Sequence, residues 1–431
     1  MNTLIILAII TTIFIGYKYR YNVGIIAILF AYLFGAFGLD LSPQDILGLW
    51  PMKIFFVIFA VSLFYNFAVV NGTMDRLAGH LLYRFRHFPN AIYLIIYAVS
   101  VILSAMGAGF FTVMAVFCPI AMRICKRSNK NILIGAQAVN WGASGGANLM
   151  TSGSGIVFQG LLVEQGFEHP FSMGIPIFLF TIIYPFILLL GYLVYERLTG
   201  RSTTDSIAVT KPEPYTSKQK INIVLIIFTI LLALVFPFLT LYTSNPLIHT
   251  INGKIDIGLV CAGMSVVALL LGLGDQKEVL TRVPWNTIVM LCGMGMLIEV
   301  AIAAGLSDQI GHFMNANVPP LLLPVSFCLV AGAMSFFSST LSVVTPALFP
   351  VVGAMVALNP SLNPELLFTA VVAGSLCTNI SPFSSAGSLM QMSAPTEADR
   401  EVLFDKQLLV GMPLSYAVCT AFVFILTFIM G

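Results

Sequence analysis

The chain has 431 residues, of which 58% are hydrophobic and 9% are charged, and its formal net charge is +2. Soluble globular proteins carry about 25% charged residues, so this composition excludes a water-soluble fold and indicates a protein embedded in a lipid bilayer. The near-neutral charge gives no electrostatic basis for nucleic-acid binding, and we expect no such partner.

Ten apolar segments are predicted to be membrane-spanning helices. A helix needs about 20 apolar residues to cross the hydrocarbon core, and somewhat fewer where the bilayer is thin. The segment at the N-terminus lacks the basic start and the small-residue cleavage site of a signal peptide, so we expect it to be the first span. In chain order the ten segments are 2–16, 22–38, 52–71, 131–163, 174–195, 221–241, 255–273, 285–305, 365–395 and 408–430.

Two further apolar stretches, hairpin 1 (90–124) and hairpin 2 (320–357), are too long for one crossing. Each is interrupted midway, the first by GAG at 107–109 and the second by SST at 338–340. The arms of each stretch are about 16 residues long, shorter than a full span, which favours a re-entrant hairpin that enters and leaves on one side. The alternative is that each stretch makes two full crossings.

The basic residues predict the orientation. With the N-terminus outside and both hairpins re-entrant, 18 of the 20 Lys and Arg residues fall on the inner side, and only Lys53 and Lys254 stay outside. An excess of Lys and Arg on the cytoplasmic side is the usual bias. We therefore expect an integral protein of a bacterial cytoplasmic (inner) membrane with both termini extracytoplasmic. A hairpin and a double crossing have the same parity, so the charges support the ten-span frame but not the hairpins themselves.

The two halves of the chain repeat each other. The first repeat is 1–195, the second is 221–431, and the charged stretch 196–220 is the predicted cytoplasmic linker. Five crossings per repeat is an odd number, so the second repeat is inverted in the membrane. The predicted fold class is an all-α polytopic membrane protein with two inverted repeats, each of five transmembrane helices, one of them broken, and a re-entrant hairpin. This layout is typical of secondary transporters. The matched residues include Pro51 with Pro284, Gly72 with Gly305, Asp75 with Asp308, Ser104 with Ser335 and Asn148 with Asn379.

Polar residues concentrate in the two broken spans, 131–163 and 365–395. They contain WGASGGANLMTSGSGIVFQG from residue 141 and GSLCTNISPFSSAGSLM from residue 374. Irregular backbone is tolerated inside a membrane only where it lines a cavity or is buried in protein. Backbone carbonyls left without a helical partner, together with Ser, Thr and Asn side-chain oxygens, are suitable ligands for Na+. The alternative is that the small residues only permit close helix packing. The candidate cation ligands are Asn148, Thr151, Ser152, Ser154, Thr378, Asn379, Ser381, Ser384 and Ser385.

The hairpin tips are candidate anion sites. Each tip starts a new helix, whose N-terminus offers unpaired N–H groups and a partial positive charge. A co-bound cation would balance an anionic substrate, so the two affinities would be linked. Glu299, an acidic residue well inside a span, is a possible proton carrier, or else a carboxyl that holds two helices together. The candidate substrate contacts are Gly107, Ala108, Gly109, Thr112, Asn148, Ser338, Ser339, Thr340, Ser342 and Asn379.

The pattern as a whole resembles the ion transporter superfamily, and within it the divalent anion/sodium symporter family and its dicarboxylate- and malonate-carrier relatives. The resemblance covers essentially the whole chain and rests on the repeats, the hairpins and the stretches GGANLMTSGSGIVF and TNISPFSSAG. It implies di- or tricarboxylate substrates, usually with Na+, and an elevator mechanism in a homodimer. The chain departs from the family at both hairpin tips, where GAGFFT (107–112) and SSTLS (338–342) replace a Ser-Asn-Thr signature.

The predicted function is cation-coupled symport of small carboxylates, with Na+ favoured. A proton-coupled or exchanging carrier of another organic or inorganic anion is the alternative. A channel would need a ring of identical filters, and an intramembrane protease would need a His deep in a span, whereas all five histidines fall at loops or span edges. Seven cysteines stand singly, without a Cys/His cluster, so we expect no transition metal, no enzyme activity and no cofactor beyond the coupling ion.

Overall fold

The computed structural model describes residues 2–19, 21–84, 87–199, 211–243, 245–336 and 339–430, and these residues form helices and turns without a strand. A helix or a helix pair lies at each of the ten predicted spans. They are α1 (Asn2–Tyr19), α2 (Val23–Gly38), α4 (Met52–Val70), α8 (Ile132–Ala147) with α9 (Gly153–Glu164), α10 (Pro170–Leu198), α11 (Ser217–Tyr242), α13 (Ile257–Leu270), α15 (Trp285–Ala303), α19 (Pro364–Cys377) with α20 (Ser385–Met392), and α22 (Met412–Met430).

Both hairpins consist of two helices joined at the predicted interruption. Hairpin 1 consists of α6 (Ile92–Leu103), the short π-helix η2 (Ser104–Ala108) and α7 (Phe110–Arg127). Hairpin 2 consists of α17 (Leu323–Ser335), the short π-helix η4 (Thr340–Val344) and α18 (Thr345–Leu358). The order of the predicted spans and hairpins is therefore the same in the two halves, whereas α12 (Pro246–Asn252), α21 (Glu397–Lys406) and η5 (Gln407–Gly411) of the second half have no counterpart in the first. The remaining elements are α3 (Pro43–Gly48), α5 (Thr73–Arg84), η1 (Pro89–Ala91), α14 (Gln276–Thr281), α16 (Leu306–Asn317) and η3 (Pro320–Leu322).

Local sequence explains where the two broken spans begin. The side-chain oxygen of Asn131 accepts from the backbone N–H of Leu133 at the start of α8. Asn363 accepts in the same way from Leu366 at the start of α19. Such caps satisfy N–H groups that the first helical turn leaves without a partner.

Large apolar side chains are exposed to the surroundings on α1, α2, α10, α11, α13 and α22, as expected for helices that face lipid. Within the described residues, three helical segments are long and apolar enough to cross a membrane: Pro170–Leu198, Ser217–Thr240 and Glu397–Met430. Two further pairs, each bent by 67°, raise this to five if each pair is one span. Seven other apolar helices in the described part have only 10–17 residues. The chain is an integral membrane protein, and the ten-span count and the inversion of the second repeat stay predictions.

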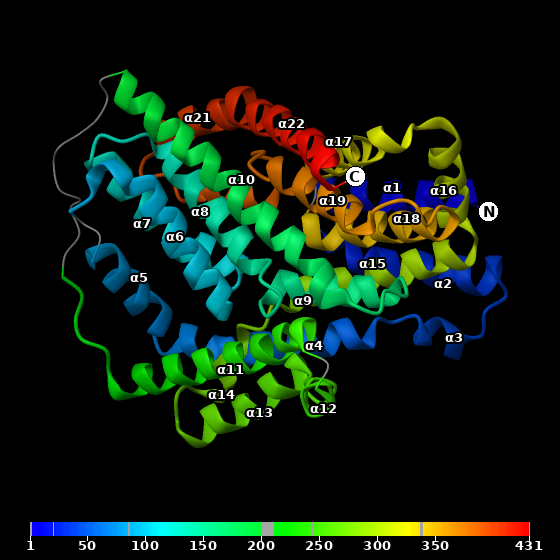
Figure 1. The fold of residues 1–431 in the computed structure, drawn as a ribbon, viewed down its shortest axis with the longest axis horizontal. Coiled ribbons are helices and arrows are strands. Elements are labelled where there is room, and N and C mark those ends of the chain that lie inside the picture. The colour runs from blue at the N-terminus through cyan, green and yellow to red at the C-terminus, as the bar shows by residue number, and fades with distance from the viewer. Residues whose placement is uncertain are drawn as a thin grey trace.

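Helices of the two halves pack against each other. α2 packs on α15, and α4 packs on α13. At the first contact, a Cβ added to Gly24 would lie 2.1 Å from the Val289 carbonyl oxygen, so only glycine permits this approach. Within each half the hairpin packs on the broken span, α6 on α8 and α17 on α19. Figure 1 shows α4, α11, α13 and α14 along one side of the molecule, apart from α6, α7, α8 and α10.

Helices extend into the predicted linker, 196–220, at both of its ends, and α11 begins at Ser217. α10 continues to Leu198, beyond the predicted linker start at residue 196. The side chain of Glu196 is buried in this last part of α10 and paired with Lys130. Residues 200–210 of the linker lie outside the described residues.

Candidate functional site

A central cavity of about 50 Å³ lies where the two hairpins meet the two broken spans. Six of the residues predicted from the sequence line it: Asn148, Ser154, Ser339, Thr340, Asn379 and Ser384. Seven lining residues were not predicted: Phe110, Phe111, Ser144, Phe158, Leu341, Leu376 and Ala386. The cavity therefore combines amide and hydroxyl groups from both halves with three phenylalanine rings from the first half.

The first break, 148–152, is tied to hairpin 1. The Ser152 hydroxyl donates to the Ser104 carbonyl oxygen at 2.8 Å, and the Ser104 hydroxyl donates to the Ala143 carbonyl oxygen at 2.7 Å. The Asn148 amide donates to the Thr181 hydroxyl at 3.2 Å. Ser152, a predicted cation ligand, thus joins the break to the hairpin tip and does not line the central cavity, because its bond to Ser104 turns it toward η2.

The second break, 378–384, has the equivalent tie. The Thr378 hydroxyl donates to the Gly332 carbonyl oxygen on α17 at 2.8 Å. The Ser384 oxygen accepts from the Gly387 N–H at 3.0 Å and so caps α20, while its hydroxyl donates to the Ser381 carbonyl oxygen at 2.8 Å. A hydroxyl oxygen has two lone pairs, so Ser384 can accept this N–H and still present a lone pair to a cation.

A buried amide network connects the two broken spans. The Asn140 amide donates to the Asn379 side-chain oxygen at 2.8 Å and to the Gln137 oxygen at 3.2 Å. The Asn379 amide donates to the Ser144 hydroxyl at 3.4 Å. Sequence reasoning missed Gln137, Asn140 and Ser144, although they stand at i, i+3 and i+7 and so form one polar stripe along an otherwise apolar helix.

Two predicted substrate contacts face a different space. Ala108 and Thr112 line a cavity of about 590 Å³ between hairpin 1 and α5, whereas Phe110 and Phe111 face the central cavity. Ala108 ends η2 and Thr112 lies in the first turn of α7, and Gly109 (φ +76°, ψ 149°) interrupts the helix between them. Contact of Ala108 and Thr112 with the substrate stays a prediction.

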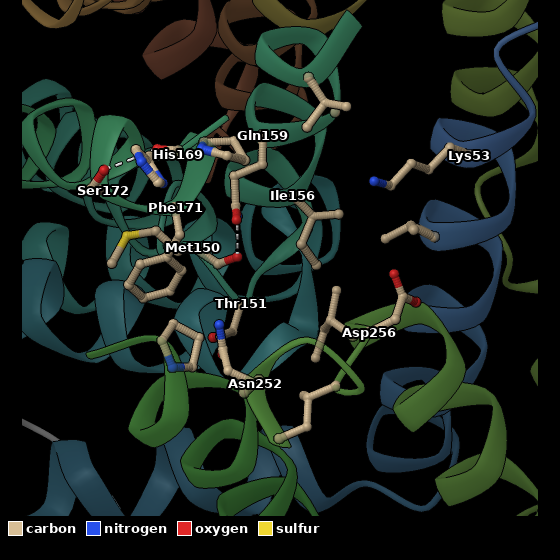
Figure 2. Close-up of a pocket in the computed structure, with 18 of the residues that line it drawn as sticks. Lys53, Met150, Thr151, Ile156, Gln159, His169, Phe171, Ser172, Asn252 and Asp256 are labelled. Atoms are coloured by element: carbon tan, nitrogen blue, oxygen red, sulfur yellow. Dashed lines mark hydrogen bonds between the residues drawn. The ribbon is translucent and has the colours of Figure 1, made fainter. Parts of the chain in front are cut away.

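Thr151 lines a third cavity, of about 330 Å³, between α4, α9 and the loop before α13. Figure 2 shows Lys53 and Asp256 on one wall of this cavity and Gln159 and His169 on the opposite wall. The Gln159 amide donates to the Met150 carbonyl oxygen at 2.6 Å. Thr151 is 2% exposed, and its hydroxyl has no partner among the described residues. The first break, 148–152, thus contributes Asn148 to the central cavity and Thr151 to the cavity in Figure 2.

The remaining predicted residues do not line the central cavity or lie outside the residues that the structure describes. Ser338 lies outside the described residues, as do the side chains of Ser342 and Ser385. The Ser381 oxygen accepts from the Phe383 N–H at 3.3 Å and supports the second break. Glu299 is half-buried in α15 and is not among the residues that line the three cavities described above.

Gly107 and Gly109 provide a matched test of the hairpin 1 turn. Both have positive φ, +88° and +76°. A Cβ on Gly107 would lie 2.1 Å from the buried Tyr65 ring of α4, whereas one on Gly109 would meet nothing within 4 Å. We expect Gly107→Ala to lose transport, because it adds a clash to a backbone strain of about 1–2 kcal/mol. Gly109→Ala adds no clash but places alanine in a backbone region (φ +76°, ψ 149°) essentially restricted to glycine, at a cost of about 1–3 kcal/mol, so it should lose some transport but less than Gly107→Ala. Equal activity of the two variants in an uptake assay at matched abundance would contradict this packing.

Two comparisons of sequence match parts of this chain to known proteins. Residues 1–147 match the family described as dicarboxylate carrier protein MatC N-terminus, which confirms the resemblance to dicarboxylate carriers over that part. A segment of 109 residues is 34% identical to a gluconate permease of Pseudomonas aeruginosa and covers 24% of each protein, so the match spans about a quarter of that relative.

Two solved structures share the fold. The YdaH transporter of Alcanivorax borkumensis superposes with a TM-score of 0.56 at 16% identity, over 89% of this chain and 86% of its own. MtrF of Neisseria gonorrhoeae, described within a class of antimetabolite efflux pumps, superposes with a TM-score of 0.52 at 15% identity, over 90% of this chain and 83% of its own. These structural likenesses establish the fold alone.

Proposed function

We propose that this protein is a secondary active transporter that carries small carboxylate anions together with a cation, Na+ in preference to H+. One observation carries the proposal: amide and hydroxyl side chains from both broken spans and from hairpin 2 line one cavity. Neutral oxygens can replace the hydration shell of Na+, and the bound cation then balances the charge of a carboxylate. The match of residues 1–147 to dicarboxylate carriers supports the substrate class.

The size of the central cavity supports alternating access. At about 50 Å³ it has room for an ion or a few water molecules, whereas pockets for organic ligands usually measure about 300 Å³ or more. A carboxylate therefore requires a hairpin to move. We propose an elevator mechanism, in which the hairpins and broken spans slide against a scaffold of α2, α4, α13 and α15. The contacts of η2 with α4 and of η4 with α15 are the surfaces that would slide. From the resemblance to the divalent anion/sodium symporter family we also propose that the protein is a homodimer in the bacterial inner membrane.

A second candidate function follows from the aromatic wall of the cavity. Phe110, Phe111 and Phe158 offer apolar surface, and hairpin 1 lacks hydroxyls at 107–111. An anion with an apolar portion would bury that portion against these rings and bind with its charged end at hairpin 2. The rings therefore favour a larger organic anion as the substrate of the alternative function, a proton-coupled or exchanging carrier; they do not bear on the coupling itself.

Uptake into proteoliposomes separates the coupling ions. With Na+ and pH gradients imposed one at a time, we expect uptake of labelled dicarboxylates to depend on the inward Na+ gradient. Because Glu299 lies apart from the central cavity, we expect Glu299→Gln to keep Na+-driven uptake within a factor of a few. Uptake that proceeds fully without Na+ and collapses in Glu299→Gln would establish proton coupling instead. Liposomes without protein provide the background.

A further inference from the structure

The cavity of about 590 Å³ lies between hairpin 1 and the helices next to it. One wall of this cavity is formed by α7, including Thr112 and Phe117. The opposite wall includes Val69 of α4 and Ala78 of α5. Figure 1 shows α5 and α7 facing each other at one end of the molecule. This is the end that the basic-residue distribution predicts to be cytoplasmic.

The charges of this cavity are strongly one-sided. Arg123, Arg127 and Arg282 line it together with a single carboxylate, Asp75. Arg282 also pairs with Glu278 at 3.1 Å, whereas Arg123 and Arg127 form no ion pair with the described residues.

The other two cavities differ. The charged lining residues of the cavity in Figure 2 are Lys53, Glu168 and Asp256, and among the described residues no charged one lines the central cavity. Of the three spaces, the one beside α5 is thus the one whose field attracts anions.

The arginines and the hairpin tip belong to one continuous surface. Thr112, Arg123 and Arg127 lie on the same face of α7, because separations of 11 and 4 residues are close to whole helical turns. Eleven residues of helix place Arg123 about 17 Å from Thr112 along the axis. Arg123 and Arg127 are exposed and Thr112 is half-buried, so the positive groups lie at the open end and the tip lies deeper.

We propose that this cavity is an anion antechamber at the predicted cytoplasmic end of the transport path, in which Arg123, Arg127 and Arg282 attract small carboxylates that leave the central cavity or approach it from inside. The barrier between the two spaces is the first turn of α7, with Thr112 on the arginine side and Phe110 and Phe111 on the central side. The inference rests on the proposed function only in taking the attracted anion to be the transported one.

The experiment measures the charge preference of the cavity without any substrate. A single cysteine is placed by Thr112→Cys in a background that lacks the seven native cysteines, and the protein is reconstituted in neutral phosphatidylcholine liposomes, so that no anionic lipid competes. An anionic and a cationic methanethiosulfonate reagent are applied to each side in turn. On the predicted cytoplasmic side the anionic reagent should react faster. Arg123→Gln with Arg127→Gln should lower the ratio of the two rates about tenfold, the low end of electrostatic focusing.

Lys126→Gln is the matched control, because Lys126 is also a cation on α7 but pairs with Asp399 and is not among the residues that line the cavity. It should leave the ratio unchanged. A ratio that is insensitive to the arginines, or equally sensitive to Lys126, would overturn the antechamber. If the ratio depends on the arginines but the wild type takes up no carboxylate, the proposed function fails while the antechamber stands. Carboxylate uptake with an insensitive ratio would instead support the proposed function and overturn the antechamber.

Discussion

Replacing Asn379 by alanine is expected to weaken the apparent affinities of carrier-mediated uptake for cation and substrate by about 10- to 100-fold. The Asn379 side chain lines the central cavity and accepts from Asn140 at 2.8 Å while it donates toward Ser144. Its loss removes a candidate cation ligand and leaves the buried Asn140 amide without that acceptor. An unsatisfied buried group costs about 1–3 kcal/mol, or about 10- to 100-fold in an equilibrium constant. Because the two ligands are linked, the apparent affinities for cation and substrate should fall together.

Asn148→Ala, the repeat-equivalent change, should act in the same direction, since Asn148 also lines the cavity. Asn222→Ala is the control: Asn222 is fully buried in α11, and neither of its side-chain polar atoms has a partner among the described residues. Uptake kinetics at several Na+ concentrations, at equal membrane abundance, check the result. Normal uptake by the Asn379 and Asn148 variants would show that neither residue binds the cation and that both serve only in helix packing.

The second large effect concerns stability. Lys130 Nζ lies 2.7 Å from a Glu196 oxygen, with side-chain exposures of 2% and 7%, and the Tyr93 hydroxyl donates to the other Glu196 oxygen at 3.1 Å. The pair joins the turn between hairpin 1 and α8 to the end of α10. Removing one partner of a buried pair leaves an uncompensated charge and costs about 3–5 kcal/mol. We therefore expect Glu196→Gln to lower the unfolding temperature in detergent clearly.

An exposed pair supplies the comparison. Arg400 and Glu397 lie 3.1 Å apart with exposures of 47% and 81%, and such pairs contribute about 0–1 kcal/mol. Glu397→Gln should therefore leave the unfolding temperature nearly unchanged. Replacing both members of the buried pair by apolar residues, as in Lys130→Met with Glu196→Leu, should recover much of the lost stability. Equal melting of the Glu196 and Glu397 variants would show that the buried pair contributes little.

Features that depend on local sequence were predictable. The helical segments follow from runs of apolar residues, which must form internally hydrogen-bonded helices in lipid. The breaks at 148–152 and 378–384 fall within the polar stretches of the two broken spans, since small and hydroxylated residues interrupt the apolar pattern there. The turn of hairpin 1 likewise falls at Gly107 and Gly109, because positive φ is accessible to glycine at little cost.

The sequence by itself therefore determined that the chain is helical and membrane-embedded, and where its spans are interrupted. Only the tertiary structure decided which side chains meet. Asn140 contacts Asn379 across 239 residues of sequence, and Thr378 is directed to hairpin 2 by the Gly332 carbonyl. Phe110 and Phe111 replace Ala108 and Thr112 at the central cavity. The physical reason is that hydropathy sets the position of a helix along the chain, whereas its rotation about its own axis is set by close packing against distant helices.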